Sequence, residues 1–305
     1  MGREIYLTDG GIETDLIFHR GQDLPHFAAF DLLKTAAGRA ALEEYFREYA
    51  ELARKLGLNL ILESPTWRAS PDWAAKLGYS EPALIEANFR AIAMLKRLRK
   101  DYESPKTRVL VSGCVGPRGD GYQPSNLMSP EEAERYHSFQ IGVFATAAVD
   151  RIAAITINYV EEAIGIARAA AAVGLPAVIA FTVETDGRLP TGQTIGSAIE
   201  AVDRQAPRAP AHYMINCAHP NHFAETLAGE EPWLARIQGL RANASAKSHA
   251  ELNDSPELDE GDPAEFGRQH GELFAKLKNL RVLGGCCGTD LRHVEAAVRA
   301  ARAFA

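Results

Sequence analysis

The stretch RVLGGCCGTD, residues 281–290, joins a short apolar run to a polar turn bounded by glycines, and a helical pattern follows it. The run Arg281–Leu283 has the composition of a buried strand. Seven similar runs, rich in Val, Ile and Leu, come before it. They are Ile5–Thr8, Leu58–Leu62, Arg108–Ser112, Ile152–Thr156, Ala177–Thr182, His212–Asn216 and Ile237–Arg241.

Helical patterns follow most of these runs. They cover Ala36–Leu56, Glu81–Lys100, Pro130–Asp150, Glu161–Val173, Thr194–Gln205, Pro263–Leu277 and Leu291–Ala303, with a short one near Asn221–Ala228. Strands that alternate with helices form a parallel sheet, and eight such strands close a barrel. The length of 305 residues fits two domains or one barrel with insertions. The sequence therefore predicts the α/β class and a (β/α)8 TIM barrel, with residues 1–305 as a single domain.

Several of the predicted helix ends coincide with residues that are suited to start or stop a helix. Gly57 and Gly174 stand where helices should end, as residues in the left-handed conformation do. Ser129 and Asp262 each precede a proline and offer a side-chain oxygen that can cap a helix start. The polar segment Ser245–Asp262 is long for a barrel loop. It is predicted to be either a surface excursion or part of an active-site lid.

Composition and charge exclude some classes of protein. The chain is 46% hydrophobic and 24% charged, which is typical of a globular protein with a large core. A net charge of -7 argues against a general binder of nucleic-acid backbones. The sequence shows neither an 18-residue apolar stretch nor an apolar signal region at its start, so we expect no membrane contact. Four cysteines, two of them adjacent, do not resemble a disulfide framework, and a reducing cytoplasm is the simplest setting.

Polar, glycine-bounded motifs follow the predicted strands at their carboxyl ends. In a (β/α)8 barrel this end is the catalytic face, because all eight loops converge there. Turn formation alone would explain the glycines but not three cysteines at two strand ends. The motifs are Asp9-Gly10-Gly11, Glu63–Arg68, Gly113–Asp120, Glu184–Gly187, Cys217–Pro220, Asn243 and Gly284–Asp290.

Cys217, Cys286 and Cys287 are the sharpest group of candidate residues. They follow the sixth and eighth strands, whose carboxyl ends both face the barrel mouth, so three thiolates can converge on one cation. Three sulfur ligands suit Zn²⁺, and a set of three leaves the open position of a catalytic site. The alternative is that these residues are buried apolar cysteines.

Four other residues near the predicted mouth have two interpretations each. His219 is either a fourth metal ligand or, as we favour, a loop histidine with a local hydrogen bond. Cys114 is interpreted as a small buried residue, since nothing near it in the sequence pairs with it. Trp67 and Tyr122 could wall a pocket for a methylated cation through cation–π contact, or could serve packing alone.

At these residues the sequence resembles the zinc-dependent homocysteine S-methyltransferase family, and the resemblance covers essentially the whole chain. It rests on four motifs, which are Thr8-Asp9-Gly10-Gly11, Gly113 with Gly116-Pro117, Asn216-Cys217, and Gly284-Gly285-Cys286-Cys287-Gly288-Thr289. The resemblance implies a (β/α)8 barrel that holds zinc on Cys217, Cys286 and Cys287. It also implies that zinc binds the acceptor thiol and that Asp9 lies near the acceptor's polar head.

Two positions depart from the family pattern. Members usually carry a glutamate at the end of strand four that contacts the acceptor's amino group, and here Ile155 takes that place. Either another acid such as Glu63 or Glu184 replaces it, or the acceptor is not homocysteine. Many members also carry Tyr-Gln-Ala after strand two, where this chain has Trp67 and Arg68. The tryptophan keeps an aromatic wall, and the arginine could bind a carboxylate.

The cysteine cluster and the family resemblance together imply a zinc-dependent methyltransferase that moves a methyl group from a small onium donor to a thiol, with homocysteine giving methionine as the leading reaction. The chain shows no cobalamin or folate module, so the donor is expected to be a free molecule such as S-methylmethionine. Two alternatives remain. The same site could act on a non-amino-acid thiol or as a demethylase, or the protein could bind metal without catalysis.

The predicted partners are small molecules, without nucleic acid or membrane, and a homo-oligomer is left open. Asp9 and the three clustered cysteines are the predicted catalytic residues. The predicted substrate-binding residues are Asp9, Gly10, Gly11, Glu63, Trp67, Arg68, Glu184 and Asn243.

Overall fold

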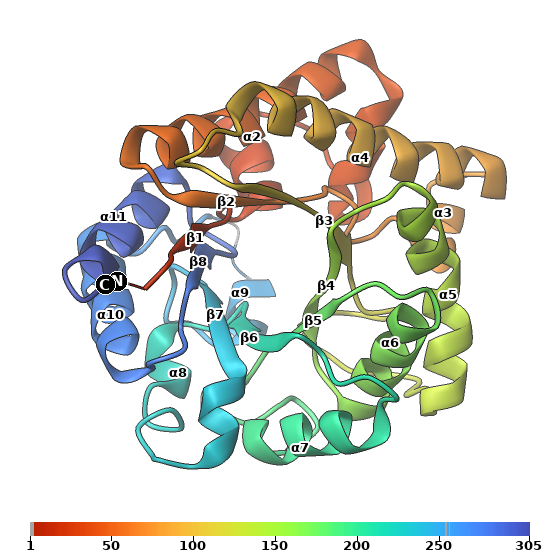
Figure 1. The fold of residues 1–305 in the computed structure, drawn as a ribbon. Helices are drawn as coiled ribbons and strands as arrows, with labels where there is room; N and C mark the ends of the chain where they lie inside the picture. The colour runs from red at the N-terminus through yellow and green to blue at the C-terminus, as the bar shows by residue number, and fades with distance from the viewer. Residues whose placement is uncertain (1–2, 254, 256) are drawn as a thin grey trace.

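Eight parallel strands form a closed barrel in chain order, from β1 through β8 and back to β1 (Figure 1). The structure is a computed structural model that describes residues 3–253, 255 and 257–305. The strands are β1 Tyr6–Leu7, β2 Asn59–Glu63, β3 Val109–Val115, β4 Arg151–Ile157, β5 Ala177–Phe181, β6 His212–Asn216, β7 Ile237–Ala242 and β8 Val282–Gly285. The predicted (β/α)8 fold is confirmed, and each predicted strand overlaps an observed one.

Helices surround the barrel on all sides (Figure 1). The longer ones are α2 Ala36–Leu56, α4 Glu81–Tyr102, α5 Pro130–Thr146, α6 Val160–Ala172, α7 Ile195–Gln205, α10 Pro263–Lys276 and α11 Leu291–Arg302. The shorter ones are α1 Ile12–Thr14, η1 Asp15–His19, η2 Pro25–Phe27, η3 Ala29–Lys34, α3 Pro71–Lys76, α8 Pro220–Phe223, η4 Pro232–Arg236 and α9 His249–Asn253. The sequence analysis predicted the long helices and missed most of the short ones, which carry too few turns for a periodic pattern.

The predicted helix ends are confirmed where a specific residue caps them. Gly57 and Gly174 both adopt the left-handed conformation after α2 and α6, with φ of 61° and 72°. Ser129 starts α5 with a complete capping box, and Asp262 accepts a hydrogen bond from the α10 backbone. Helix α5 ends at Thr146, four residues before its predicted end, and the left-handed Ala148 (φ 51°) stops it from continuing.

Alternation along the strands divides the core into two parts. Leu60 and Leu62 of β2 face outward and pack in the large cluster between barrel and helices. Ile61, between them, faces the barrel interior with Val178 of β5 and Val282 of β8. Side chains fill the interior, so the barrel is a packed core that opens only at the end where the functional loops lie.

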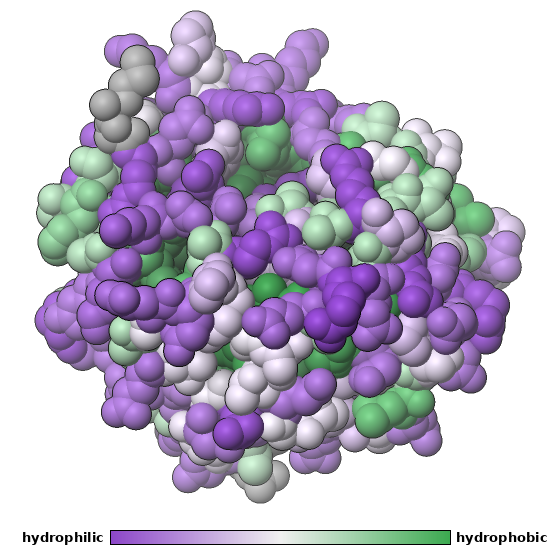
Figure 2. Space-filling model, turned by 60° about the horizontal axis from the view of Figure 1, so that its bottom comes forward, coloured by the Kyte–Doolittle hydropathy of each residue, from purple (hydrophilic) through white to green (hydrophobic). Residues whose placement is uncertain are grey.

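The outer surface in the view of Figure 2 is largely hydrophilic, and hydrophobic side chains show in scattered patches and hollows. None of the helices formed by the described residues is both long and apolar enough to cross a membrane.

Candidate active site

A cavity of about 440 Å³ lies among the loops that follow the barrel strands. Its wall combines the three clustered cysteines with acidic, basic and aromatic side chains. Its lining residues include Asp9, Gly10, Gly11, Glu13, Glu63, Trp67, Arg68, Cys114, Tyr122, Ile155, Thr156, Cys217, Arg241, Cys286 and Cys287. The predicted gathering of polar loops at the carboxyl ends of the strands is thus observed.

The three predicted cysteines meet at the wall of this cavity. The sulfur atoms of Cys217, Cys286 and Cys287 all lie within 4.8 Å of one another. Cys217 and Cys286 are joined as a disulfide with their Cα atoms 5.3 Å apart, and the Cys287 sulfur lies 3.8 Å from that of Cys217. The strand ends that gather sulfurs for a metal thus also bring Cys217 and Cys286 together as a pair, which the sequence analysis did not predict.

Polar side chains surround the sulfur cluster. The Tyr122 hydroxyl lies 3.5 Å from the sulfurs of both Cys217 and Cys287. Asn216, the residue before Cys217, donates from its side-chain amide toward Cys286 Sγ at 3.8 Å and to Thr156 Oγ1 at 2.8 Å. The cluster is therefore held by hydrogen bonds from the loop after β3 and from β6, and Thr156 of β4 holds the β6 amide in place.

Two residues of this assembly adopt a conformation that is unfavourable for them. Cys217 has φ of 54° and Thr156 has φ of 63°, which is rare for a β-branched residue. The backbone amide of Thr156 donates to Asn216 Oδ1 at 2.9 Å, so the same asparagine bonds Thr156 twice. Left-handed residues of this kind cluster at functional sites, where surrounding contacts hold them. Here those contacts fix the direction in which the Cys217 side chain points.

Close packing of the first and last loops explains the glycines near the cluster. A Cβ atom on Gly10 would lie 2.7 Å from the Tyr49 hydroxyl, and one on Gly11 would collide with the Cys286 carbonyl. Gly288 adopts φ of 78°, which turns the chain directly after the cysteine pair. Gly10 and Gly11 therefore line the cavity and let the two loops approach, a role that needs no substrate contact.

Asp9 lies on the cavity wall in a network of buried partners. Its Oδ1 accepts from Arg241 Nη2 at 2.8 Å and from Thr8 at 3.0 Å, and its Oδ2 accepts from Tyr45 at 3.1 Å. Burial raises the pKa of Asp9, while the Arg241 charge and these hydrogen bonds act in the opposite direction. The sequence analysis missed Arg241, although a charge between two buried apolar residues of a strand, Leu240 and Ala242, is a signal for the barrel interior.

Glu63 also has an ion-pair partner inside the barrel. Its Oε1 accepts from Arg151 Nη2 at 2.8 Å, and both side chains are buried. Its Oε2 is buried and has no hydrogen-bond partner among the described residues. Glu63 therefore lines the cavity as predicted, but one of its oxygens already bonds a cation from β4.

Trp67 and Arg68 line the cavity from the loop after β2. The Trp67 indole donates to the Ile155 carbonyl at 2.9 Å, which fixes the ring against β4. The Arg68 guanidinium lies 3.9 Å from the Trp73 ring centroid and 4.9 Å from that of Trp67, and it donates to the His26 carbonyl. The Ile155 side chain is buried, with its apolar surface toward the same cavity. The predicted aromatic wall and the predicted arginine thus belong to one pocket.

Glu184 and Asn243 lie behind the cavity and do not line it. Glu184 and Gly187 (φ 75°) belong to a turn after β5, in which the Gly187 amide donates to the Glu184 carbonyl at 2.9 Å. Glu184 lies 3.1 Å from His249 Nδ1, while His249 Nε2 donates to the Cys217 carbonyl at 2.8 Å. The His249 ring also stacks on Tyr122, with centroids 4.0 Å apart. Glu184 therefore supports the sulfur cluster through His249, which the sequence analysis did not single out.

His219 and Cys114 take the structural roles that the sequence analysis favoured. His219 Nδ1 accepts from the Asn221 backbone at 3.2 Å and caps α8. The group of potential metal ligands among the described residues contains the three cysteines and not His219. Cys114 is buried in the barrel interior, and burial raises the pKa of its thiol well above the usual value.

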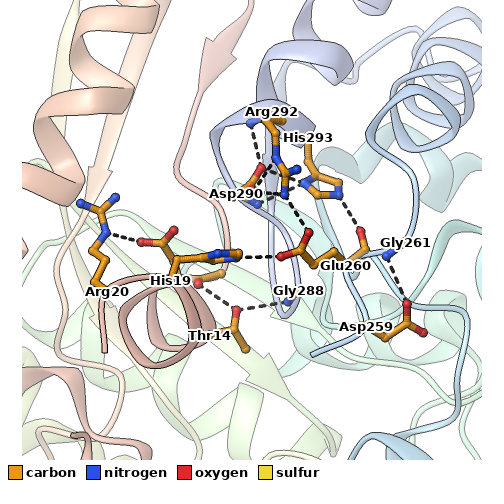
Figure 3. Close-up of polar contacts among 12 residues, drawn as sticks. Thr14, His19, Arg20, Asp259, Glu260, Gly261, Gly288, Asp290, Arg292 and His293 are labelled. Atoms are coloured by element: carbon orange, nitrogen blue, oxygen red, sulfur yellow. Dashed lines mark hydrogen bonds and ion pairs between the residues drawn. The ribbon is translucent and has the colours of Figure 1, made fainter. Parts of the chain in front are cut away.

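Described residues of the 245–262 segment line part of the cavity, which favours the predicted lid over a surface excursion. Ser245 and Asp259 line the cavity and are hydrogen-bonded to each other at 2.6 Å. Figure 3 shows Glu260 between His19 of η1 and Arg292 of α11, at 3.1 Å and 2.9 Å. The Glu260 carbonyl also accepts from His293 at 2.8 Å. The lid is thus attached to both the first and the last loop of the barrel.

A closed parallel barrel whose loops gather three cysteine sulfurs in a cavity has the architecture of a barrel enzyme with a thiol centre. A family model described as homocysteine S-methyltransferase matches residues 6–301, so the chain belongs to that family and is a methyltransferase.

Solved structures agree with this assignment at the level of the fold. The metallated form of the homocysteine methyltransferase MmuM from Escherichia coli is similar with a TM-score of 0.74 at 20% identity, over 97% of this chain and 96% of that one. The oxidized form of MmuM gives 0.73 at 21% identity, over 97% and 95%. A search among curated proteins found no match.

Proposed function

We propose that this methyltransferase is zinc-dependent and transfers a methyl group from a small onium donor to the thiol of homocysteine or a close analogue. The observation that carries the proposal is the convergence of three cysteine sulfurs on one wall of the barrel cavity. The donor set fits zinc, because three soft sulfur ligands suit Zn²⁺ and leave a position open for a substrate. In the disulfide two of those sulfurs carry no thiolate, so metal binding requires Cys217 and Cys286 to be reduced.

When bound, zinc supplies the Lewis acidity that keeps a substrate thiol in its nucleophilic thiolate form near neutral pH. The protein's own contribution is then positioning and the exclusion of water, since the reaction is an in-line displacement at a methyl carbon. The bond from the onium atom to the methyl group breaks as the new carbon–sulfur bond forms. The donor leaves as a neutral molecule, and the thiol proton passes to solvent.

The cavity wall offers groups for both substrates. The aromatic faces of Trp67 and Tyr122 suit a methylated cation. S-methylmethionine is the donor that we propose, with methionine as the product of transfer to homocysteine. Asp9 is proposed to orient the acceptor, because a carboxylate has lone pairs beyond those used by Arg241, Thr8 and Tyr45.

Ile155 favours a second candidate function. Its apolar side chain lines the cavity at the position where the family resemblance implies an ammonium-binding glutamate. A thiol without an amino group would fit that wall better, so transfer to or from a non-amino-acid thiol is the alternative.

Metal analysis of reduced protein tests the proposal. We expect about one zinc per chain, as three-thiol catalytic sites hold a single metal. Changing Cys217, Cys286 or Cys287 to Ala should remove the metal and abolish methyl transfer from S-methylmethionine to homocysteine. Each variant should keep the circular dichroism spectrum of a folded barrel. Cys114→Ala is the matched control and should keep the metal, because its thiol lies outside the cluster. Full zinc occupancy in Cys286→Ala would remove that residue from the site.

A further inference from the structure

Glu13 is an acidic residue of the cavity that forms no ion pair with any described residue. It belongs to α1, directly after the Asp9-Gly10-Gly11 turn, and its side chain is partly buried in the cavity wall. Two other acids of this wall are already paired, Asp9 with Arg241 and Glu63 with Arg151. The charge of Glu13 therefore has no partner side chain within ion-pair distance in the described parts of the chain.

Burial disfavours the ionised form of the Glu13 carboxylate. Burial raises the pKa of Glu13 to about 7, although a hydrogen bond from its own backbone acts against it; the Asp9 charge adds to the increase, and the Arg68 and Arg241 charges oppose it. A cation that enters the cavity would supply the missing compensation, since a buried charge is stable only when it is paired.

Arg68 is the complementary group on the same wall. Its guanidinium is held by the His26 carbonyl and by the Trp73 ring, and its Nε has no hydrogen-bond partner among the described residues. The charges of Arg68 and Glu13 act on each other, yet the two side chains form no ion pair. A planar guanidinium is suited to a carboxylate, which the Nη donors of Arg68 would contact because its Nε atom is buried.

We propose that Glu13 and Arg68 together bind the head group of an α-amino acid, Glu13 taking the ammonium and Arg68 the carboxylate of the thiol acceptor. The inference rests on the proposed function for the identity of the acceptor. An α-amino acid carries both charges on one carbon, which matches the acidic Glu13 and the basic Arg68 in the wall of one cavity. Glu13 then supplies the ammonium contact that Ile155 cannot make, and the acceptor is an amino-acid thiol in spite of the apolar residue on β4.

A set of three thiols tests the two contacts separately. L-homocysteine carries both charges, 4-mercaptobutanoate lacks the ammonium, and 3-aminopropane-1-thiol lacks the carboxylate. Wild type should prefer homocysteine over each truncated thiol by about tenfold to a hundredfold in kcat/KM, which is typical for loss of one charge-assisted hydrogen bond. Glu13→Gln should bring homocysteine and 4-mercaptobutanoate within about threefold and leave the other preference intact. Arg68→Met should do the reverse.

Glu161→Gln serves as the matched control, because Glu161 is exposed on α6 and lies outside the cavity. It should leave both preferences unchanged. If Glu13→Gln keeps the full preference for homocysteine over 4-mercaptobutanoate, the ammonium is bound elsewhere, with Glu63 as the next acid of the wall, and the inference is overturned. It is also overturned if Glu13→Gln raises only the KM of S-methylmethionine, since Glu13 would then bind the onium group of the donor.

A binding measurement separates this inference from the proposed function. L-methionine and 4-(methylthio)butanoate can be compared by calorimetry without any methyl donor. Wild type should bind methionine about tenfold or more tightly than its deamino analogue, and Glu13→Gln should remove that difference. If this result holds while no thiol is methylated, the proposed function fails and the amino-acid site stands. Equal binding of the two compounds by wild type would overturn the amino-acid site, whatever the result of the activity assay.

Discussion

At the scale of single residues, two buried carboxylates of the barrel interior each form an ion pair with a buried arginine. Asp9 with Arg241 and Glu63 with Arg151 are ion pairs between buried side chains that come from different strands or strand ends. Such pairs contribute little net stability against an apolar core, but removing one partner leaves an uncompensated buried charge. They therefore fix which side chains can line the cavity.

Asp9→Asn should lower the free energy of unfolding by about 3 kcal/mol, because Arg241 then remains buried without its counter-charge. Asp72→Asn is the matched control. Asp72 bonds Arg118 at 2.7 Å, but both side chains are 45% exposed, so its loss should cost no more than about 1 kcal/mol. Urea denaturation of the three proteins measures both values. Equal effects of the two substitutions would show that the Asp9 pair is solvated in solution.

The same substitution separates positioning from metal binding. Since Asp9 belongs to no group of potential metal ligands among the described residues, Asp9→Asn should retain zinc while it raises the KM for the acceptor. Unchanged kinetics in a folded, zinc-loaded variant would leave Asp9 with a purely structural role.

At the scale of elements, helices α10 and α11 pack closely through glycine. A Cβ atom on Gly267 would lie 2.9 Å from the Ala296 Cβ, and one on Gly271 would lie 3.0 Å from the Ala300 Cβ. Gly142 in α5 is different, because a Cβ there would have no neighbour within 4 Å in the part of the chain that the structure describes. The two environments predict opposite effects of the same substitution.

Gly267→Ala should lower the free energy of unfolding by about 1–3 kcal/mol, because one helix must shift to admit the methyl group. Gly142→Ala should raise it by about 0.5–1 kcal/mol, since alanine loses less backbone entropy in a helix and meets no obstacle. Thermal unfolding of both variants checks the pair. Destabilisation by Gly142→Ala would mean that α5 has a partner on that face in solution.

The sequence predicted the elements that follow a regular period, and it was weakest where the chain leaves that period. The proximity of Cys217 and Cys286 could be predicted from the sequence, because the carboxyl ends of parallel barrel strands converge. Glu13 could not, because it lies within the three-residue helix α1, which runs directly into the π-helix η1, and no regular period there assigns a side chain to a face. Glu184 does not line the cavity, because it belongs to the turn after β5, in which the Gly187 amide donates to its carbonyl.

At the scale of the whole molecule, the lid joins the two ends of the barrel sequence. Glu260 contacts His19 near the start of the chain and Arg292 near its end, as Figure 3 shows. Partly exposed ion pairs of this kind contribute little to global stability. They matter instead for how often a covering segment opens.

Glu260→Gln should therefore leave the melting temperature within about 2–4 °C of wild type, which corresponds to roughly 1 kcal/mol in a large domain. It should nevertheless increase the rate of protease cleavage within the 245–262 segment severalfold. Glu272→Gln is the control, because Glu272 pairs with Arg268 on the exposed face of α10, away from the lid. Equal cleavage rates in wild type and Glu260→Gln would show that other contacts hold the lid.

The contact between the first and last loops also has a consequence for the order of events during synthesis. The Gly288 amide donates to Thr14 Oγ1 across a sequence separation of 274 residues, and Gly11 packs on the Cys286 carbonyl. A nascent chain that has reached the seventh strand has a single cysteine of the cluster and an open sheet edge beside its first strand. Residues up to about 288 must therefore leave the ribosome before all three cysteines can meet. Until then β1 lacks its β8 neighbour, so a chaperone would encounter an open sheet edge.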